Sequence, residues 1–384
     1  MFIFPRRLLF LLFILLIASS TSSKPGFPPS LPPGCLKSDG TNINLYCAGD
    51  DGYGCYKIPT ILRTSNGTLL SMIEARKYSC DDKGWIDLRL RRSFDNGTSW
   101  TPTTTVHSNS TTTQWTTVGD ANMVEDVSTG TIWLFHTRNN SKLFLSSSFN
   151  QGETWSTPRE VTSSLKLGYP TQGWIGTGHA GGIQISKGIN KGRLIIPTYT
   201  NRSYMIYSDD AGLTWHKGQA TTGGENQVSE TGTFTKDGQA ILIISIRNSP
   251  KYPNWMPLTH GHRLLALSHD SGVTWGNTWH AKDLPEPIKG CDGSIVFHPN
   301  GKLYFSHPDP PLGFFRTRMR IWSSNDIGLS WQVHATVWKE AAGYSALTVM
   351  GTEKEADLGL LYDRNNHTMI IFEAQSVSWT TFSS

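Results

Sequence analysis

The sequence contains few charged residues, and their charges nearly cancel. Lys and Arg number 34 and Asp and Glu number 30, so that 17% of the 384 residues are charged and the formal net charge is +4. Proteins that bind nucleic acid concentrate positive charge on one face or along one helix. So small an excess, spread over so long a chain, argues against a nucleic-acid partner.

Long apolar runs are also lacking. The longest covers residues 8–18, which is too short for a helix that crosses a bilayer, so we predict no transmembrane segment. Arg6 and Arg7 precede this run, and the small residues 19–23 follow it. Basic residues, a short apolar run and small residues in this order are typical of a cleavable signal peptide, which we predict at residues 1–23.

The residues that follow indicate a linker and then a secreted domain. Residues 24–46 begin with KPGFPPSLPPG, a proline-rich stretch that favours an extended linker, and the folded domain is predicted at residues 47–384. Sequons for N-linked glycans occur six times, at Asn66, Asn96, Asn109, Asn139, Asn201 and Asn366. We therefore expect a glycoprotein of the secretory pathway, either lysosomal or extracellular.

Cysteine is scarce, and its pattern excludes the common metal sites. The five residues are Cys35, Cys47, Cys55, Cys80 and Cys291. Their spacing matches no zinc motif, and no His, Cys or carboxylate cluster has metal-ligand spacing, so we expect neither a metal nor another cofactor. An odd count in an oxidising compartment leaves at least one thiol free or intermolecular, while the pairing itself cannot be read from the spacing.

Glycine and aromatic residues, in contrast, are abundant, and many belong to an internal repeat. The chain has 37 Gly and 14 Trp. An octapeptide Ser-x-Asp-x-Gly-x-Thr/Ser-Trp recurs, once with Asn for Asp, at residues 93–100, 148–155, 208–215, 268–275 and 324–331. The steps between copies are 55, 60, 60 and 56 residues, and so regular a step indicates a repeat architecture.

The chemistry of the octapeptide suits a turn between strands. Its Asp or Asn can accept hydrogen bonds from nearby backbone N–H groups, its Gly supplies a positive φ, and its Trp returns to the interior. Strand-length apolar runs precede the turns, for example at residues 192–199 and 240–246. Since residues 47–384 hold about six such units, we predict an all-β, six-bladed β-propeller in which the octapeptides are structural.

The octapeptides resemble the Asp boxes of the sialidase superfamily, and a second group of motifs resembles the start of that family's propeller. It consists of Tyr-Lys-Ile-Pro at residues 56–59, Glu-Ala-Arg at 74–76 and Asp-Asp-Lys-Gly at 81–84. Sorting receptors also carry Asp boxes, so the combination is the specific signal. It is most similar to animal sialidases of the lysosomal type, which implies an exo-α-sialidase acting on glycoproteins, gangliosides and other sialylated glycans, and suggests a lysosomal protective-protein partner.

The resemblance also implies which residues bind the substrate. Sialic acid carries a carboxylate on its anomeric carbon, and Arg is the preferred partner because its planar fork meets a carboxylate with two hydrogen bonds. The three cationic positions of the family fall on Lys57, where the family has Arg, on Arg247 and on Arg316, with Arg318 as an alternative to the last. Arg76 is implied to bind other polar groups of the substrate.

Three further positions match the family's catalytic residues. Sialidases use a Tyr nucleophile, since the substrate's own carboxylate would repel a carboxylate nucleophile. Tyr344 in Gly-Tyr-Ser matches this nucleophile, and Glu225 in Glu-Asn-Gln matches the base beside it, with Glu230 as a competing choice. Asp82 aligns with the acid/base on a mobile loop, and Asp81 is the adjacent alternative.

Two departures from the family pattern coincide. Besides Lys57, the late Leu-Leu-Tyr-Asp segment has Asp363 where the family has a Glu that steadies the first Arg. A hydrogen bond to a charged group contributes roughly 1.5–3 kcal/mol, and Lys lacks the fork of Arg. We therefore expect an active enzyme with reduced affinity or an altered preference. The alternatives are a weak or inactive sialic-acid-binding, lectin-like propeller and a receptor propeller that shares only the Asp boxes.

Overall fold

The chain forms β-sheets almost throughout. The computed structural model describes residues 42–167, 173–248, 261–287, 289–310, 316–351, 356–364 and 376–383. Within these ranges the only helix is a 3-10 turn, η1 (Asp50–Gly52), and none is long and apolar enough to cross a membrane. The predicted signal peptide, most of the predicted linker, Cys35 and Asn366 lie outside the described residues.

Four of the sheets contain four or five antiparallel strands. The first holds β2 (Cys55–Arg63), β3 (Leu69–Arg76), β4 (Ile86–Ser93) and β5 (Thr104–His107). The second holds β6 (Val118–Asp126), β7 (Thr131–Arg138), β8 (Lys142–Ser148) and β9 (Arg159–Glu160). The third holds β10 (Gly176–Thr177), β11 (Ile183–Gln184), β12 (Leu194–Tyr199), β13 (Ser203–Ser208) and β14 (His216–Lys217). The fourth holds β15 (Asn226–Phe234), β16 (Ala240–Ile246), β17 (Gly261–Ser268) and β18 (Trp279–Glu286).

The fifth sheet is larger and corrects the prediction of six blades. It has seven strands, β19 (Ser294–Phe297), β20 (Leu303–Pro308), β21 (Thr317–Ser324), β22 (Gln332–Met350), β23 (Asp357–Arg364), β24 (Ser376–Ser383) and β1 (Asn42–Cys47). The described residues thus form five sheets, because the 19-residue strand β22 pairs with β21 through its first half and with β23 through its second. The number of repeats could not reveal that one long strand, β22, joins two neighbouring groups of strands into a single sheet.

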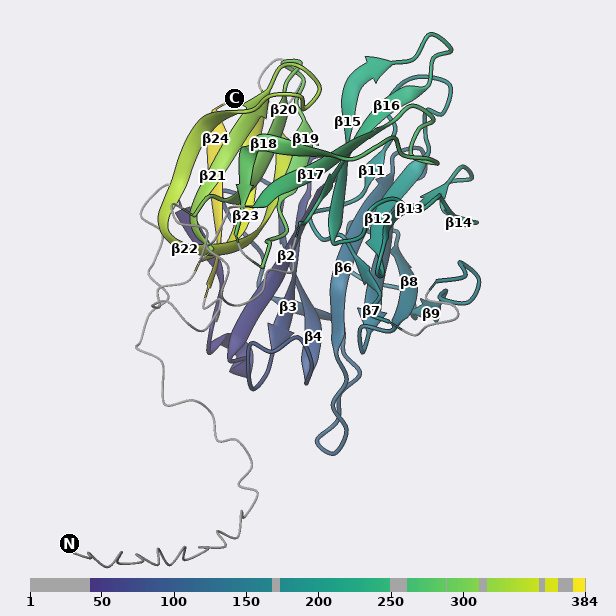
Figure 1. Ribbon diagram of the computed structural model, residues 1–384. Coiled ribbons are helices and arrows are strands. Elements are labelled where there is room, and N and C mark those ends of the chain that lie inside the picture. The colour runs from purple at the N-terminus through teal and green to yellow at the C-terminus, as the bar shows by residue number, and fades with distance from the viewer. Residues whose placement is uncertain are drawn as a thin grey trace, which may run out of the picture.

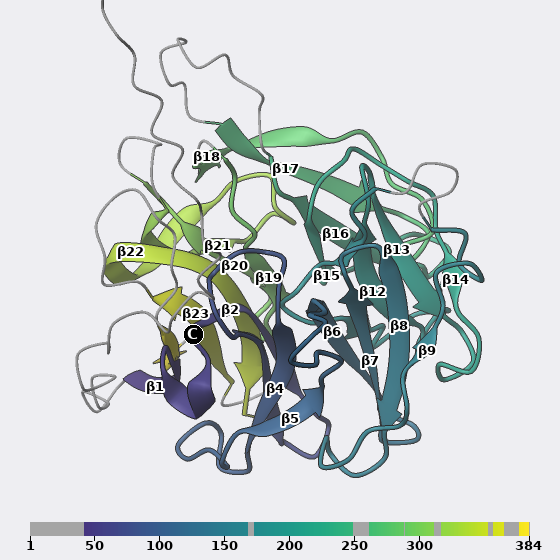
Figure 2. The same ribbon diagram turned by 90° about the horizontal axis from the view of Figure 1, so that it is seen from below.

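The five sheets are arranged around a central axis, as Figures 1 and 2 show. The innermost strands contact one another in a closed ring, in the order β2, β6, β12, β15, β19, β22 and back to β2. The all-β, propeller-like part of the prediction is therefore confirmed. The ring is completed by the two ends of the chain, because β1 pairs with β24 from Asn42 opposite Thr380 to Cys47 opposite Ser376. β1 begins inside the segment that we predicted as linker.

The Asp boxes have the predicted turn geometry. In the first box, Asp95 Oδ1 accepts hydrogen bonds from Ser93 Oγ and from the Ser99 N–H, both at 2.8 Å. Trp100 Nε1 donates to the Gly97 carbonyl at 3.0 Å, and Gly97 has a φ of 85°. The contacts of the Ser with the Asp or Asn recur in the other boxes, and the Trp contact recurs in all of them except the box at residues 268–275, where Trp275 Nε1 has no partner among the described residues. These residues therefore stabilise the outer turns of the sheets and leave the chemistry to the centre.

The cysteines divide into bonded and free. Cys55 and Cys80 form a disulfide, and Cys47 is also disulfide-bonded. Cys291 is free and fully buried, which raises the pKa of its thiol to about 12. The odd count therefore leaves a thiol that is neutral and shielded from solvent.

Candidate active site

A pocket near the central axis brings together residues that lie far apart in the sequence. Its lining includes four of the predicted site residues, Arg76, Asp82, Glu225 and Tyr344. It also includes polar or aromatic residues that the sequence did not single out for a role: Glu74, Asp120, Asn140, Trp174, His179 and Tyr199. Strands from several sheets contribute, so the pocket exists only in the folded ring.

Tyr344 lies on β22, with its phenol held between two guanidinium groups. Arg247 Nη1 donates a hydrogen bond to the Tyr344 hydroxyl at 3.3 Å, and the Arg316 guanidinium lies 4.7 Å from the centre of the ring. Burial and the nearby Glu225 raise the pKa of Tyr344 to about 12, although both arginines act in the opposite direction. The phenol is therefore neutral at physiological pH, and it needs a base to become a nucleophile.

The carboxylate of Glu225 lies near the Tyr344 hydroxyl, because both contact the same arginine. It directly precedes β15, and Arg247 directly follows β16, so the pairing of these strands sets the two residues side by side. Arg247 Nη1 donates to Glu225 Oε2 at 2.6 Å, and this same nitrogen contacts Tyr344. The alternative, Glu230, instead accepts hydrogen bonds from the backbone and side chain of Ser186, outside this pocket.

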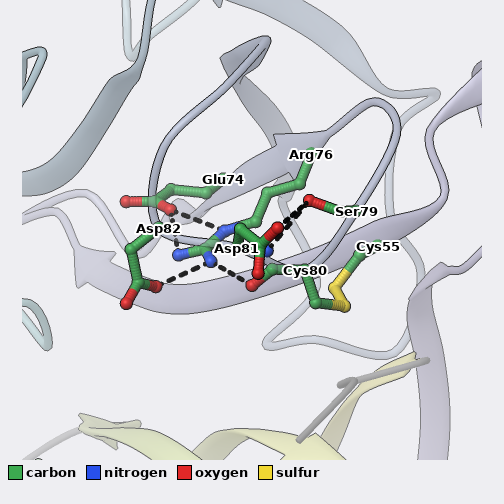
Figure 3. The surroundings of a disulfide bond; sticks show 7 residues. All are labelled: Cys55, Glu74, Arg76, Ser79, Cys80, Asp81 and Asp82. Carbon is green, nitrogen blue, oxygen red and sulfur yellow. Dashed lines mark hydrogen bonds and ion pairs between the residues drawn. A yellow bond between two sulfur atoms is a disulfide. The ribbon is translucent and has the colours of Figure 1, made fainter. Parts of the chain in front are cut away.

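Asp82 lies at the mouth of the pocket, next to Arg76 (Figure 3). Arg76 Nη1 is 2.8 Å from Asp82 Oδ1, and Arg76 Nη2 is 2.7 Å from Glu74 Oε2. Partial burial raises the pKa of Asp82, but Arg76 and Lys57 outweigh it, so that the pKa is lowered overall. The alternative, Asp81, is exposed and accepts a hydrogen bond from Ser79, so the structure brings Asp82 to the pocket.

The loop that carries Asp82 is anchored at several points. The disulfide to Cys55 ties Cys80 to β2, and Arg76 Nη1 donates to the Cys80 carbonyl at 2.6 Å (Figure 3). Asn140 Nδ2 donates to the Asp82 carbonyl at 2.9 Å. Arg76, only 2% exposed, thus supports the loop and also lines the pocket.

The structure also separates the late arginines. Arg316 donates from Nε and Nη2 to the Gly290 carbonyl and covers the ring of Tyr344. Arg318 and Arg320 both pair with Asp309. Of these arginines, Arg316 is therefore the one beside Tyr344, whereas the alternative, Arg318, is paired with Asp309.

Lys57 and Asp363 lie near each other but do not form a close pair. Lys57 Nζ is 6.0 Å from the centre of the Tyr344 ring, and Asp363 Oδ2 accepts a hydrogen bond from the Tyr344 N–H at 3.3 Å. Burial raises the pKa of Asp363 to about 7, against the influence of Lys57. Burial and the charge of Arg76 lower the pKa of Lys57. Among the described residues, no nitrogen–oxygen distance within 4.0 Å joins the two side chains.

Asp120 is a pocket residue to which the sequence analysis gave no role. It is 8% exposed, its N–H donates to Glu74 Oε1 at 2.8 Å, and its φ is 47°. Burial, Glu74 and Glu225 raise the pKa of its carboxyl well above the ordinary range. A charged residue inside a strand that is buried throughout, such as 118–126, was the available signal, because buried carboxylates are rare without a function or a partner.

Metal ions find no site here: the described part of the chain contains no group of three or more His, Cys, Asp or Glu side chains that could hold one. A phenol lies next to a carboxylate and two guanidinium groups, and a second carboxylate lies at the mouth. This arrangement can bind an anion and transfer protons.

Comparisons with known proteins identify the family of this chain. The BNR repeat-like domain family matches residues 67–360. A sialidase of Micromonospora viridifaciens is 28% identical over 366 residues, covering 84% of this chain and 52% of the relative. Sialidase-2 of Mus musculus is 27% identical over 379 residues, covering 84% of this chain and 92% of the relative. The chain spans only 62% of a similar sialidase of Bacteroides fragilis.

Solved structures show the same fold. The Hadza microbial sialidase Hz136 superposes with a TM-score of 0.71 at 24% identity, over 89% of this chain and 68% of that one. A leech intramolecular trans-sialidase superposes with a TM-score of 0.70 at 18% identity, over 91% of this chain and 70% of that one. From the matched repeats and these relatives, the chain belongs to the BNR repeat-like domain family and to the sialidase superfamily.

Proposed function

We propose that this protein is an exo-α-sialidase that hydrolyses terminal α-linked sialic acids from glycoproteins, glycolipids and oligosaccharides with retention of configuration. The observation that carries the proposal is the single nitrogen of Arg247, which contacts both Glu225 and Tyr344. A phenol and a carboxylate held by one guanidinium, with Asp82 in the same pocket, form a nucleophile, base and acid set.

In the proposed reaction, Lys57, Arg247 and Arg316 bind the carboxylate of the sialic acid. Glu225 accepts the proton of the Tyr344 hydroxyl as the phenol oxygen attacks the anomeric carbon. Asp82 donates its proton to the leaving glycosidic oxygen and then accepts one from the water that hydrolyses the glycosyl-tyrosine intermediate. The guanidinium groups beside Tyr344 stabilise the phenolate when it leaves again.

The lowered pKa of Asp82 has a consequence for the pH dependence of this reaction. The carboxyl must be protonated to act as the acid, and a lowered pKa leaves little of the acid form at neutral pH. The proposed turnover therefore rises as the pH falls from 7 toward 5.

The location in the cell is also a proposal. We infer a protein of the secretory pathway, lysosomal or extracellular, with the signal peptide at residues 1–23 and, in the lysosome, a protective-protein partner. The disulfide between Cys55 and Cys80 supports this, since such bonds persist in oxidising compartments.

The test is an assay of the secreted protein on a fluorogenic sialoside between pH 4 and 7, beside Tyr344→Phe. We expect turnover by the wild type and a loss of at least ~1,000-fold in the variant, because the phenol oxygen itself is the nucleophile. Equal activity of Tyr344→Phe would refute the assigned nucleophile.

A second candidate is a lectin-like protein that binds sialic acid with little or no turnover. The lack of an ion pair within 4.0 Å between Lys57 and Asp363, both of which lie in the described part of the chain, favours it, since the family's Arg and Glu are longer side chains. Folded wild-type protein that binds sialic acid in calorimetry, but releases none from the sialoside, would select this candidate.

A further inference from the structure

A series of buried charged side chains lies behind the pocket and has no part in the proposed reaction. His307 Nε2 is 3.1 Å from Glu286 Oε2, and Glu286 Oε1 is 2.8 Å from Arg263 Nη1. Arg263 Nη2 is in turn 3.1 Å from Asp292 Oδ1. All four side chains are fully buried. We call these four residues the buried charge series.

The buried charge series is an unusual way to fill a core. Ions are costly to bury, and apolar side chains of similar volume often stabilise a fold as well or better. Leu and Ile residues fill the equivalent space elsewhere in this molecule, for example Leu70, Leu88 and Leu134 between the first two sheets. Such a series is therefore more informative about function than about stability.

The charges of the series are not balanced within it. Glu286 and Asp292 share one guanidinium, that of Arg263. Glu286 receives two further donors, the N–H groups of Asn248 and Cys291. Asp292 has a different additional partner, because its Oδ2 lies 3.2 Å from His179 Nδ1, although the two atoms are not aligned for a hydrogen bond.

His179 links the series to the proposed nucleophile. It lies between β10 and β11, is 3% exposed, and lines the pocket. Its imidazole is 4.9 Å from the ring of Tyr344, centre to centre, and nearly perpendicular to it at 83°. Perpendicular aromatic pairs at this separation are favourable and directional, so the imidazole restricts the plane of the phenol.

Electrostatics couple the same imidazole to the base. Burial lowers the pKa of His179, whereas Asp292, Glu225 and Glu74 act in the opposite direction and Arg247 adds to the lowering. These charged groups face His179 from β3, from the start of β15, from the end of β16 and from the segment before β19. The imidazole thus lies between the buried series and the pair formed by Glu225 and Tyr344.

We propose that His179, held by Asp292, is a positioning residue that keeps the phenol of Tyr344 in the orientation in which its oxygen meets Arg247 and Glu225. Arg263 fixes Asp292 through the ion pair at Oδ1, the close approach of Asp292 Oδ2 restrains the imidazole, and the imidazole restricts the plane of the phenol. This inference rests on the proposed function, since orientation of the phenol matters only for a reaction at its oxygen.

Two substitutions separate the parts of this arrangement. His179→Phe keeps an aromatic ring against Tyr344 but removes the partner of Asp292. Asp292→Asn keeps the shape of the side chain but removes its charge. Because a small displacement of a reacting group can cost on the order of 100-fold in rate, we expect each to lower kcat by ~10- to 100-fold. KM should change by less than ~3-fold, since neither residue is among those proposed to bind the substrate carboxylate.

A matched control lies at the other end of the series. His307→Gln removes the ring that contacts Glu286, far along the series from Tyr344, and we expect it to lower Tm while kcat stays within ~3-fold of the wild type. The double variant of His179→Phe and Asp292→Asn should lose no more activity than the more affected single variant, because both act through one contact. Independent losses that multiply would overturn the proposal, as would equal losses of kcat in all three single variants.

A second measurement keeps the inference testable if the wild type proves inactive. Tyrosine labelled with ¹³C at Cζ gives a signal for Tyr344 that Tyr344→Phe identifies by its absence. We expect one sharp signal in the wild type and in His307→Gln, and a shifted or multiple signal in His179→Phe and Asp292→Asn. An inactive wild type with this pattern would refute the proposed function and leave the positioning intact. An unchanged signal in both variants would refute the positioning, whatever the activity.

Discussion

Arg76 and Lys57 occupy neighbouring strands of one sheet, β3 and β2, yet the protein holds them very differently. Arg76 donates to Glu74, to Asp82 and to the Cys80 carbonyl, which uses nitrogens on all sides of its fork. No ion pair within 4.0 Å involves Lys57 in the described part of the chain. Protein groups thus hold Arg76 through four of its five N–H donors, whereas Lys57 is only partly buried and has no acidic partner within 4.0 Å among the described residues.

This difference indicates a division of labour. A cation with most of its donors used can position a neighbouring group, here Asp82, and has few donors left for a ligand. A cation without a close partner remains available to an incoming anion, at a cost that burial of an unpaired charge imposes. In the proposed function, Arg76 therefore positions the acid/base Asp82, and Lys57 binds the substrate carboxylate.

The strongest test of this comparison removes each cation in turn. Arg76→Met leaves the buried Glu74 without its partner, and breaking a buried pair in this way costs roughly 3–5 kcal/mol in the free energy of unfolding. Lys57→Met removes a partly buried charge without a close partner and should cost less than ~1 kcal/mol. Urea denaturation of both variants measures the difference, and equal losses would contradict the division described above.

The next test replaces Lys57 and Asp363 with the Arg and Glu that the family has at these two positions. Lys57→Arg combined with Asp363→Glu lengthens both side chains and restores a bidentate fork for the substrate carboxylate. We expect kcat/KM on a fluorogenic sialoside to rise by about 10-fold, mainly through KM, because one charged hydrogen bond is gained. Lys57→Arg alone is the control, and no rise or a fall in the double variant would show that the short pair suits this enzyme's own substrate.

The smallest expected effect concerns Asp363 alone. Its pKa in the folded protein is about 7, above the ordinary 3.8, so the folded state binds this proton more tightly than the unfolded state does. Its contribution to stability is fully present below pH 4 and is lost as the pH rises through about 7. Asp363→Asn removes this loss, so the variant's Tm relative to the wild type should be higher at pH 8 than at pH 5. A difference in Tm that does not vary with pH would mean that Asp363 is ionised throughout.

Much of the fold could be predicted because its local signals are strong. The five Asp boxes specify their own turns through Ser, Asp or Asn, and Gly residues within eight positions, and the structure reproduces those contacts. The count of sheets could not be predicted in the same way. It depends on hydrogen bonds between distant strands, and β22 continues from one group into the next without any break in its sequence that the repeat would reveal.

In the candidate site, likewise, local motifs could predict residues but not the contacts between them. Motifs located Tyr344 and Glu225, but only the fold shows that Arg247 contacts both. The choice between Asp81 and Asp82 rests on which side chain reaches Arg76, and adjacent residues cannot be distinguished by pattern alone. His179 and Asp292 are more than one hundred residues apart, and nothing in either local sequence indicates that they meet.

The pairing of β1 with β24 also has a consequence for how the protein is made. A ring closed by the first and last strands cannot be completed until the ribosome has delivered nearly the whole chain, and this closure is the longest-range contact in the fold. Until then β1 is an unpaired strand edge, which other chains can extend. Synthesis that ends before residue 376 would leave this edge open for good, and such truncated chains should aggregate rather than accumulate as smaller folded rings.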